Sequence, residues 1–135
     1  MKLAPIEEVK EITKNDRKNL SIHEVEPSEK YKTGKAKRLY PRQCYENAFR
    51  YVADKGNLEG IKLVHGLYKP KDINNHCGHA WVELPKNIIF DGVLQRFYHK
   101  DGYYSYYQAI KQNEYDCKQM YDIGFKAGGH FGPWN

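Results

Sequence analysis

Three residues in the middle of the chain have the side-chain types of a nucleophilic catalytic site. Cys44 lies in RQCYENAFRYV, His79 in HCGHAWVEL and Asp91 in NIIFDGV. A thiolate is a strong nucleophile, an imidazole can take up and return a proton, and a carboxylate can orient the imidazole. The residue types therefore suggest Cys44 as nucleophile, His79 as base and Asp91 as the group that orients His79.

Cys44 is positioned by a predicted helix. Apolar residues recur at helical spacing from Cys44 to Val52, Pro41 precedes them, and Gly56 supplies a stop signal. A thiol in the first turn lies near the positive end of the helix dipole, which favours the thiolate. The free N–H groups of that turn can bind an oxyanion, and the Gln43 side chain is a further candidate donor.

His79 and Asp91 are positioned by two predicted strands, HAWVEL and NIIFDGV, which are joined by a turn at Pro85. Side chains alternate across a strand, so the register decides which residues meet. A three-residue loop between Glu83 and Asn87 is expected to place His79 directly opposite Asp91, with Cβ atoms about 4.5–5.5 Å apart. At that separation the carboxylate can accept a hydrogen bond from the imidazole.

Together, QCYENAF, GHAWVEL and IIFDGV resemble the papain-like and transglutaminase-like cysteine enzymes over residues 43–93. In that superfamily a cysteine at a helix start is followed by a strand histidine, often in HAW, and then by an aspartate on the next strand. The resemblance implies a papain-like/transglutaminase-like core with Cys44 as nucleophile, His79 as general base and acid, and Asp91 as orienting residue.

The resemblance also implies a covalent thioester and a bond of the amide, isopeptide or carboxamide class. With water as acceptor the protein would be a hydrolase, such as a thiol protease (cysteine peptidase), an isopeptidase, an amidase or a deamidase. With an amine as acceptor it would be an acyltransferase, and the residues leave this choice open.

Further candidates lie close to these positions. Tyr45, His76 and Trp81 are candidates for contacts with a substrate. The string HCGH also suggests a metal site, but tetrahedral zinc is usually bound by two separated pairs of ligands. His76, Cys77 and His79 have no second pair in the sequence, so we expect no metal and no cofactor.

The remaining chain predicts the framework of the fold. We expect a helix at residues 5–14, a loop at 15–41 with a short strand near SIHEVE, a strand at IKLVHGLY, and a helix from Ser105 to about Tyr121. Three aromatic residues of the glycine-rich tail, Phe125, Phe131 and Trp134, are expected to fold back onto the domain. This order predicts an α+β fold with a small antiparallel sheet.

The composition predicts one globular domain. The chain has 135 residues, of which 40% are hydrophobic and 29% charged. We divide it into an N-terminal helix and basic loop segment at residues 1–40 and a catalytic core at residues 41–135. No apolar run approaches the ~18 residues that span a bilayer, and the N-terminus lacks the apolar core of a signal peptide. We therefore expect a cytoplasmic protein without a membrane partner, in which Cys77 and Cys117 are inert thiols.

A binding module is the alternative to an enzyme. The net charge is +5, and much of it lies in KYKTGKAKRLYPR at residues 30–42. A basic segment with interleaved tyrosines can contact phosphates or an acidic surface. The alternative is a non-catalytic module of the same fold that recognises a protein or a nucleic acid through this surface. The Cys, His, Asp order favours the enzyme, with a protein or peptide as substrate.

Overall fold

The computed structural model describes residues 22, 24–35, 40, 42–70 and 74–134. The described helices are the 3-10 helix η2 (Glu29–Tyr31) and the α-helices α2 (Cys44–Lys55), α3 (Lys100–Tyr107) and α4 (Cys117–Lys126). The described strands are β1 (Lys62–Tyr68), β2 (Cys77–Leu84), β3 (Ile88–Asp91), β4 (Arg96–His99) and β5 (Ile110–Tyr115). The helix predicted at residues 5–14 lies outside the described residues.

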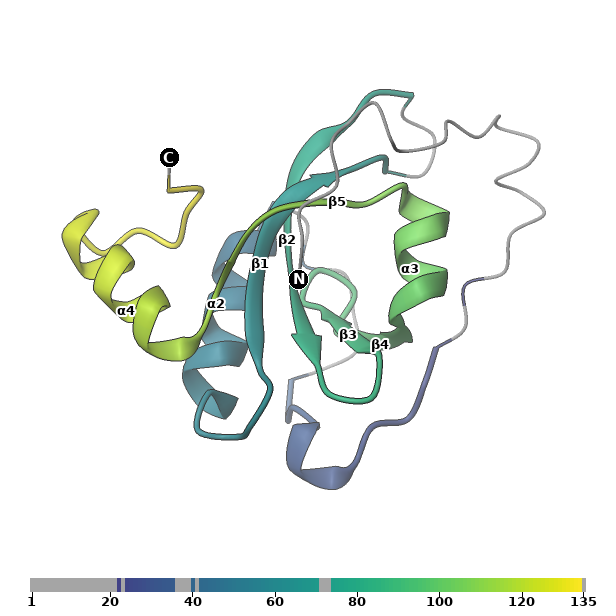
Figure 1. Ribbon diagram of the computed structural model, residues 1–135, viewed down its shortest axis with the longest axis horizontal. Helices are drawn as coiled ribbons and strands as arrows, with labels where there is room; N and C mark the ends of the chain where they lie inside the picture. Colours follow the sequence, from purple (N-terminus) through teal and green to yellow (C-terminus); the bar gives the residue numbers. More distant parts are fainter. Residues whose placement is uncertain (1–21, 23, 36–39, 41, 71–73, 135) are drawn as a thin grey trace.

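The strands form one antiparallel sheet in the order β4-β3-β2-β1-β5. Helices α2 and α4 lie on one face of the sheet, and α3 lies on the other (Figure 1). The α+β class and the small antiparallel sheet predicted from the sequence are therefore confirmed. Within the described part of the chain, no helix has the length and apolar character to cross a membrane.

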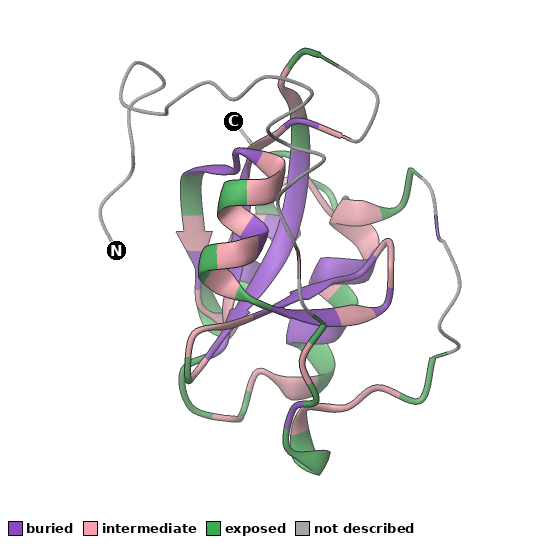
Figure 2. Ribbon diagram, turned by 90° about the vertical axis from the view of Figure 1, so that its right-hand side faces the viewer, coloured by how far each residue is buried: buried purple, intermediate pink, exposed green. Residues whose placement is uncertain are grey.

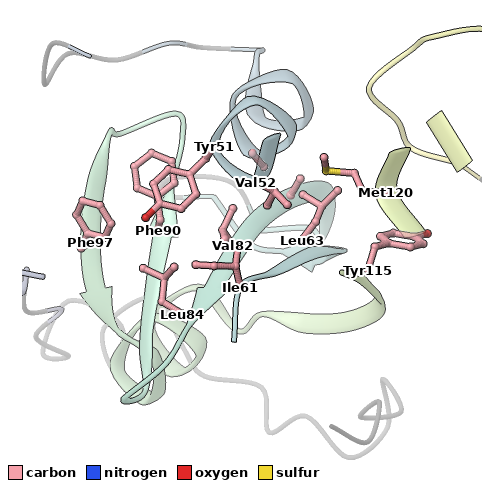
Figure 3. Packing of buried hydrophobic residues seen from close by; sticks show 12 residues of the cluster. Tyr51, Val52, Ile61, Leu63, Val82, Leu84, Phe90, Phe97, Tyr115 and Met120 are labelled. Carbon is pink, nitrogen blue, oxygen red and sulfur yellow. The ribbon is translucent and has the colours of Figure 1, made fainter. Parts of the chain in front are cut away.

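Helix α2 packs on the centre of the sheet. Its buried residues recur every three or four positions and are Asn47, Ala48, Tyr51 and Val52. The Tyr51 ring stacks on Phe90 of β3, with ring centroids 4.3 Å apart. These residues belong to the larger of two hydrophobic clusters, which fills the space between α2, α4 and the sheet (Figure 3). Because α2 is anchored on β1 and β2, the position of Cys44 in its first turn is set by the core.

The second hydrophobic cluster lies on the opposite face, beneath α3. Its buried members are Val64, Trp81, Ile89, Tyr98, Tyr103 and Ala109. Buried residues run along the strands, whereas α2 shows buried and exposed residues in alternation (Figure 2). The sheet is therefore covered on both faces, and the side chains on both faces of β2 are buried.

The helix predicted from Ser105 to Tyr121 is wrong. Ser105 lies in the last turn of α3, and the chain then forms strand β5 before α4 begins. Asp116 is the N-cap of α4: its Oδ1 accepts a 2.8 Å hydrogen bond from the Gln119 N–H, while the Asp116 N–H donates to Gln119 Oε1 at 2.9 Å. This capping box is visible in the string DCKQ. Strand β4 was also not predicted from the sequence.

The chain before α2 and the tail after α4 partly match the expectations. Near SIHEVE the described residues make one isolated bridge, Glu24 to Tyr98, instead of a strand. In the tail, Trp134 and Phe131 pack edge-on against Phe49 of α2. Phe125 is 88% exposed. The fold-back prediction therefore holds for two of the three aromatic residues.

Candidate active site

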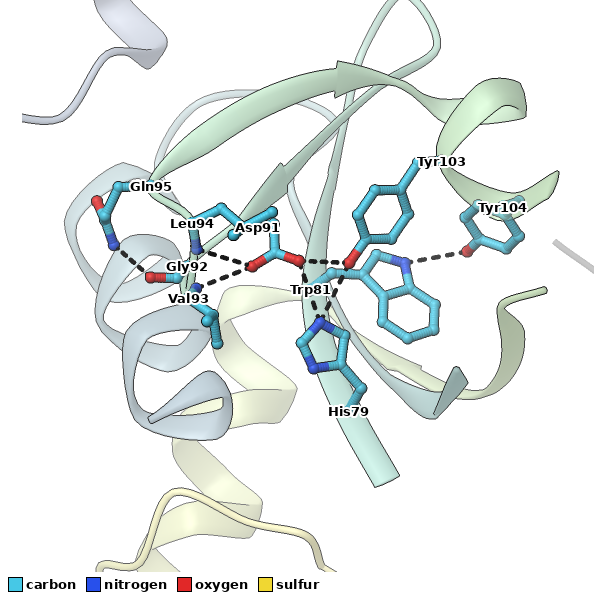
Figure 4. Close-up of polar contacts among 9 residues, drawn as sticks. All are labelled: His79, Trp81, Asp91, Gly92, Val93, Leu94, Gln95, Tyr103 and Tyr104. Atoms are coloured by element: carbon cyan, nitrogen blue, oxygen red, sulfur yellow. Dashed lines mark hydrogen bonds and ion pairs between the residues drawn. The ribbon is translucent and has the colours of Figure 1, made fainter. Parts of the chain in front are cut away.

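His79 and Asp91 meet, although not in the predicted register. The observed pairing sets Val82 opposite Phe90 and Leu84 opposite Ile88, because the turn occupies residues 85–87. Continuing this register places Asp91 opposite Trp81, so His79 is a diagonal neighbour. The predicted register is wrong by two residues, but a shift of two keeps both side chains on the same face. His79 Nε2 lies 3.2 Å from Asp91 Oδ2 (Figure 4).

The Asp91 carboxylate is held by hydrogen bonds to both of its oxygens. Oδ1 accepts from the N–H groups of Val93 and Leu94 at 2.9 and 3.2 Å, in the turn that follows β3. Oδ2 accepts from the Tyr103 hydroxyl at 2.6 Å and from His79. Burial alone would raise the pKa of Asp91, but His79, Tyr103 and the Leu94 N–H together hold it below its usual value. Asp91 is therefore a carboxylate at neutral pH.

The His79 ring is almost completely enclosed, with 2% of the residue exposed. The Tyr68 ring stacks on it, with centroids 3.8 Å apart and planes at 10°. Burial by itself lowers the pKa of His79, but the hydrogen bonds and negative charges of Asp91 and Cys44 outweigh it and raise the pKa to about 9. The ring is therefore an imidazolium at neutral pH, paired with a buried carboxylate.

Cys44 reaches His79 from the opposite face of the sheet because β3 is short. Strand β3 pairs with β2 only as far as Val82, while β2 continues beyond that point to Cys77. The start of α2 lies beside this uncovered part of β2. The Cys44 side chain there is close enough to His79 to raise the pKa of the imidazole.

Two glycines allow this close approach. A Cβ atom at Gly92 would lie 2.6 Å from Asn47 Cβ, so only glycine lets the first turns of α2 pack against the turn after β3. A Cβ atom at Gly78 would lie 2.8 Å from the Tyr45 hydroxyl oxygen. A larger residue at Gly92 would push the first turns of α2 away from the turn after β3, whereas one at Gly78 would have to displace the Tyr45 side chain.

The ring nitrogens of His79 have different partners. Both Asp91 and the Tyr103 hydroxyl contact Nε2, at 3.2 and 3.1 Å. Nδ1 is thus the nitrogen left for Cys44. A thiol on one ring nitrogen and a carboxylate on the other is the arrangement that lets an imidazole move a proton to and from the sulfur.

The start of α2 also has backbone donors for a developing oxyanion. Gln43 is the N-cap residue, and its side chain makes no capping hydrogen bond. The first backbone bond of the helix runs from the Asn47 N–H to the Gln43 carbonyl at 2.9 Å. The N–H groups of Cys44, Tyr45 and Glu46 precede that bond and have no carbonyl partner within the helix. The Gln43 side chain is exposed, beside the thiol-bearing residue.

The other predicted site residues occupy different environments. Tyr45 is half-buried, and burial together with the charge of Cys44 raises its pKa. His76 is partly buried and its Nε2 lies 3.0 Å from the carbonyl oxygen of Gln108, so its ring is already engaged. Trp81 is completely buried, and its N–H donates to the Tyr104 hydroxyl at 3.1 Å. The predicted contact of Trp81 with a substrate does not fit this burial.

The HCGH string does not form a cluster of ligands. Its first histidine is bound to Gln108 as above, and Cys77 Sγ lies 3.8 Å from the Asn75 carbonyl oxygen. Within the described ranges, no three His, Cys, Asp or Glu side chains are grouped so as to hold a metal ion. Cys117 is partly buried, and burial together with the Asp116 charge raises the pKa of its thiol.

Tyr103 is a member of the site that sequence reasoning missed. It lies in α3, is completely buried and contacts both Asp91 and His79. The only sequence signal was the tyrosine cluster of DGYYSYY, in which no single residue stands out.

His65 on β1 is a second buried histidine, outside this group. Its ring packs against Tyr45, Tyr115 and Trp134, and its Nε2 has no hydrogen-bond partner among the described residues. Burial lowers the pKa of His65 to about 4. A proton on this ring would place a charge among aromatic rings.

We expect the protein to lose stability between pH 6.5 and pH 4 because of His65. Over this pH range His65 binds a proton in the unfolded chain but stays neutral in the folded protein. The difference lowers the free energy of unfolding by up to about 3 kcal/mol as the pH falls. His65→Leu keeps an apolar side chain of similar size and should flatten this part of the profile. Urea unfolding at several pH values would measure it, and equal slopes for both proteins would contradict the assignment.

Comparison with protein-family models, with curated proteins and with solved structures gives no match to this chain.

Proposed function

We propose that the protein is a cysteine-dependent hydrolase or acyltransferase that acts on amide, isopeptide or carboxamide bonds through a covalent thioester. Cys44 is the nucleophile, His79 the general acid and base, and Asp91 the orienting carboxylate. The observation that carries the proposal is the buried His79–Asp91 pair, together with the Cys44 side chain close enough to raise the pKa of the same imidazole.

Charge and burial support this assignment beyond mere proximity. A buried imidazolium beside an anchored carboxylate stabilises a thiolate at the start of a helix, where the helix dipole acts in the same direction. A purely structural histidine gains nothing from a thiol at its second nitrogen. Buried ion pairs are also a weak source of stability, because desolvation offsets most of the attraction. The pair is thus better explained by chemistry at Cys44.

The reaction follows from these positions. The Cys44 thiolate attacks the carbonyl carbon, and the backbone N–H groups at the start of α2 stabilise the oxyanion. The C–N bond then breaks, and the His79 imidazolium gives its proton to the departing nitrogen. The now neutral His79 takes a proton from water or from an acceptor amine, which attacks the thioester. Collapse of this second intermediate releases the acyl product and restores the thiolate–imidazolium pair.

The direct test is competitive alkylation of the folded protein with iodoacetamide at pH 6.5, followed by peptide mass analysis. Cys44 should react at least about ten times faster than Cys77 and Cys117, because only a thiolate reacts at an appreciable rate. The two other cysteines serve as internal controls in the same sample. If all three react at similar rates, Cys44 is not an activated nucleophile and the protein is better described as a binding module.

Identification of the substrate then follows from the same residue. Electrophilic probes with acyl or peptide side chains of different kinds would be compared for their rates of adduct formation at Cys44. Cys44→Ala provides the matched control, since it removes the sulfur and keeps the helix. A probe preference that disappears in Cys44→Ala would define the acyl group that the site accepts.

A further inference from the structure

Tyr103 places a third polar group against the His79–Asp91 pair. Its hydroxyl oxygen lies 2.6 Å from Asp91 Oδ2 and 3.1 Å from His79 Nε2. Figure 4 shows the three groups as a closed triangle, with His79 from β2, Asp91 from β3 and Tyr103 from α3. The triangle therefore joins a helix to two strands at one point.

The hydrogen-bond roles within the triangle follow from the chemistry of the three groups. An ionised carboxylate can only accept, so the Tyr103 O–H must donate to Asp91. The hydroxyl oxygen then still has lone pairs, and His79 Nε2–H can donate to both Asp91 and Tyr103. Two acceptors at Nε2 keep a proton on that nitrogen and leave Nδ1 available to Cys44.

The Tyr103 hydroxyl is fixed in space. The residue is completely buried, and its ring packs against Trp81, Tyr98 and Tyr107. Burial and the negative charge of Asp91 raise the pKa of Tyr103 well above its usual value, so that the hydroxyl keeps its proton and remains a donor. A second tyrosine of α3, the partly buried Tyr104, also donates to a carboxylate, Glu83 Oε2, at 2.5 Å and away from His79.

We infer that Tyr103 is a positioning residue of this site: its hydroxyl orients the Asp91 carboxylate and the His79 ring so that Nδ1 faces Cys44. This inference rests on the proposed function for its catalytic meaning, but the hydrogen-bond triangle can be tested without it. Tyr103 touches neither the reacting sulfur nor the carbonyl carbon of a substrate. It acts through His79 and Asp91.

Several ionisable groups surround His79 and must be considered in any pH profile. They lie beside the ring or beside its partner Asp91 and are Cys44 of α2, Tyr68 of β1, Asp91 of β3, Tyr98 of β4, and Tyr103 and Tyr107 of α3. Burial raises the pKa of Tyr98 to about 12 and that of Tyr107 further. Below pH 9, therefore, these tyrosines are uncharged, and the Asp91 carboxylate carries the negative charge that pairs with His79.

The experiment compares Tyr103→Phe with Tyr104→Phe in the full chain. Both variants remove a hydroxyl that donates to a carboxylate, both keep the ring, and both lie in α3, but only Tyr103 contacts the His79–Asp91 pair. The first readout is the carbon-13 signal of the Asp91 carboxyl group during an acid titration. The second is the rate of Cys44 alkylation between pH 5 and pH 9.

In Tyr103→Phe we expect the titration midpoint of Asp91 to move up by about one pH unit, because the carboxylate loses a donor. We expect the alkylation rate of Cys44 at pH 6.5 to fall about tenfold, the effect of losing one hydrogen bond to a charged group. Tyr104→Phe should change neither quantity by more than about twofold. Equal effects in both variants, or none in Tyr103→Phe, would overturn the inference.

The two proposals fail in different ways. If Cys44 of the unaltered protein proves unreactive, the proposed function falls, but the Asp91 titration still reports on Tyr103. A midpoint that moves only in Tyr103→Phe then shows that the hydroxyl orients the pair. A midpoint that stays in place, together with a reactive Cys44, overturns the positioning role and leaves the proposed function standing.

Discussion

Replacing Asp91 with asparagine should destabilise the protein by about 3 kcal/mol at pH 7. The carboxylate receives four hydrogen bonds and pairs with a buried imidazolium. Asparagine has nearly the same shape and can still accept from Val93 and Leu94. Its amide, however, would set an N–H group against the Nε2–H of His79 and leave a buried charge without a counter-ion. Urea unfolding at pH 7 would measure the loss.

The cost of Asp91→Asn should depend on pH in a direction that identifies His79 as the partner. The pKa of His79 is raised to about 9 in the folded protein, so its contribution to stability is complete below about pH 6.5 and is lost as the pH rises through 9. The difference between the two proteins should therefore be smaller at pH 10 than at pH 7. A difference that does not change with pH would mean that the charge of His79 plays no part.

Glu83→Gln is the matched control for Asp91→Asn. Glu83 is another buried carboxylate of the sheet, 7% exposed, and it binds Lys111 at 2.6 Å and Tyr104 at 2.5 Å. Its replacement should also reduce stability, because the buried Lys111 then keeps only the more exposed Glu114 as counter-ion. It should not alter the alkylation of Cys44. If Glu83→Gln lost both stability and Cys44 reactivity, a loss of reactivity in Asp91→Asn would show only that a loosened fold impairs the thiol.

Replacing His79 with glutamine should lower the alkylation rate of Cys44 at pH 6 by about 10- to 100-fold. At that pH an unassisted thiol is almost entirely protonated, whereas a thiol paired with an imidazolium is largely a thiolate. Glutamine retains hydrogen-bonding capacity but cannot carry the positive charge. The measurement is the rate of mass increase at Cys44 under a small excess of iodoacetamide.

Two controls separate this charge effect from a general change in accessibility. The rates at Cys77 and Cys117 should be the same in His79→Gln and in the unaltered protein. His99→Gln removes an exposed histidine at the end of β4 and should leave Cys44 unchanged. At pH 10 the advantage of the unaltered protein should shrink, because His79 has then lost its proton. Equal Cys44 rates in both proteins at pH 6 would exclude His79 as the activating group.

Local sequence signals were sufficient for the central part of the fold. The helix that begins at Cys44 and the two strands that carry His79 and Asp91 each have a strong periodic pattern, with proline or glycine at their boundaries. They were insufficient after residue 95. Helical spacing continues beyond the tyrosine-rich stretch, but residues 110–115 form strand β5 because their backbone pairs with β1, which is remote in the chain. Pairing of this kind leaves little trace in the local pattern.

The candidate site shows the same division. The residue types and the parity of the strands were enough to place His79 and Asp91 on one face, since a register error of two residues does not change the face. Three features needed the assembled fold: the short β3 that lets the start of α2 reach β2, the diagonal contact of His79 with Asp91, and the Tyr103 hydroxyl from α3. Each depends on how elements distant in the chain pack together. Alternation and spacing in the sequence determine which residues share a face of one helix or strand. The distances between the thiol, the imidazole, the carboxylate and the phenol depend on how different elements pack together.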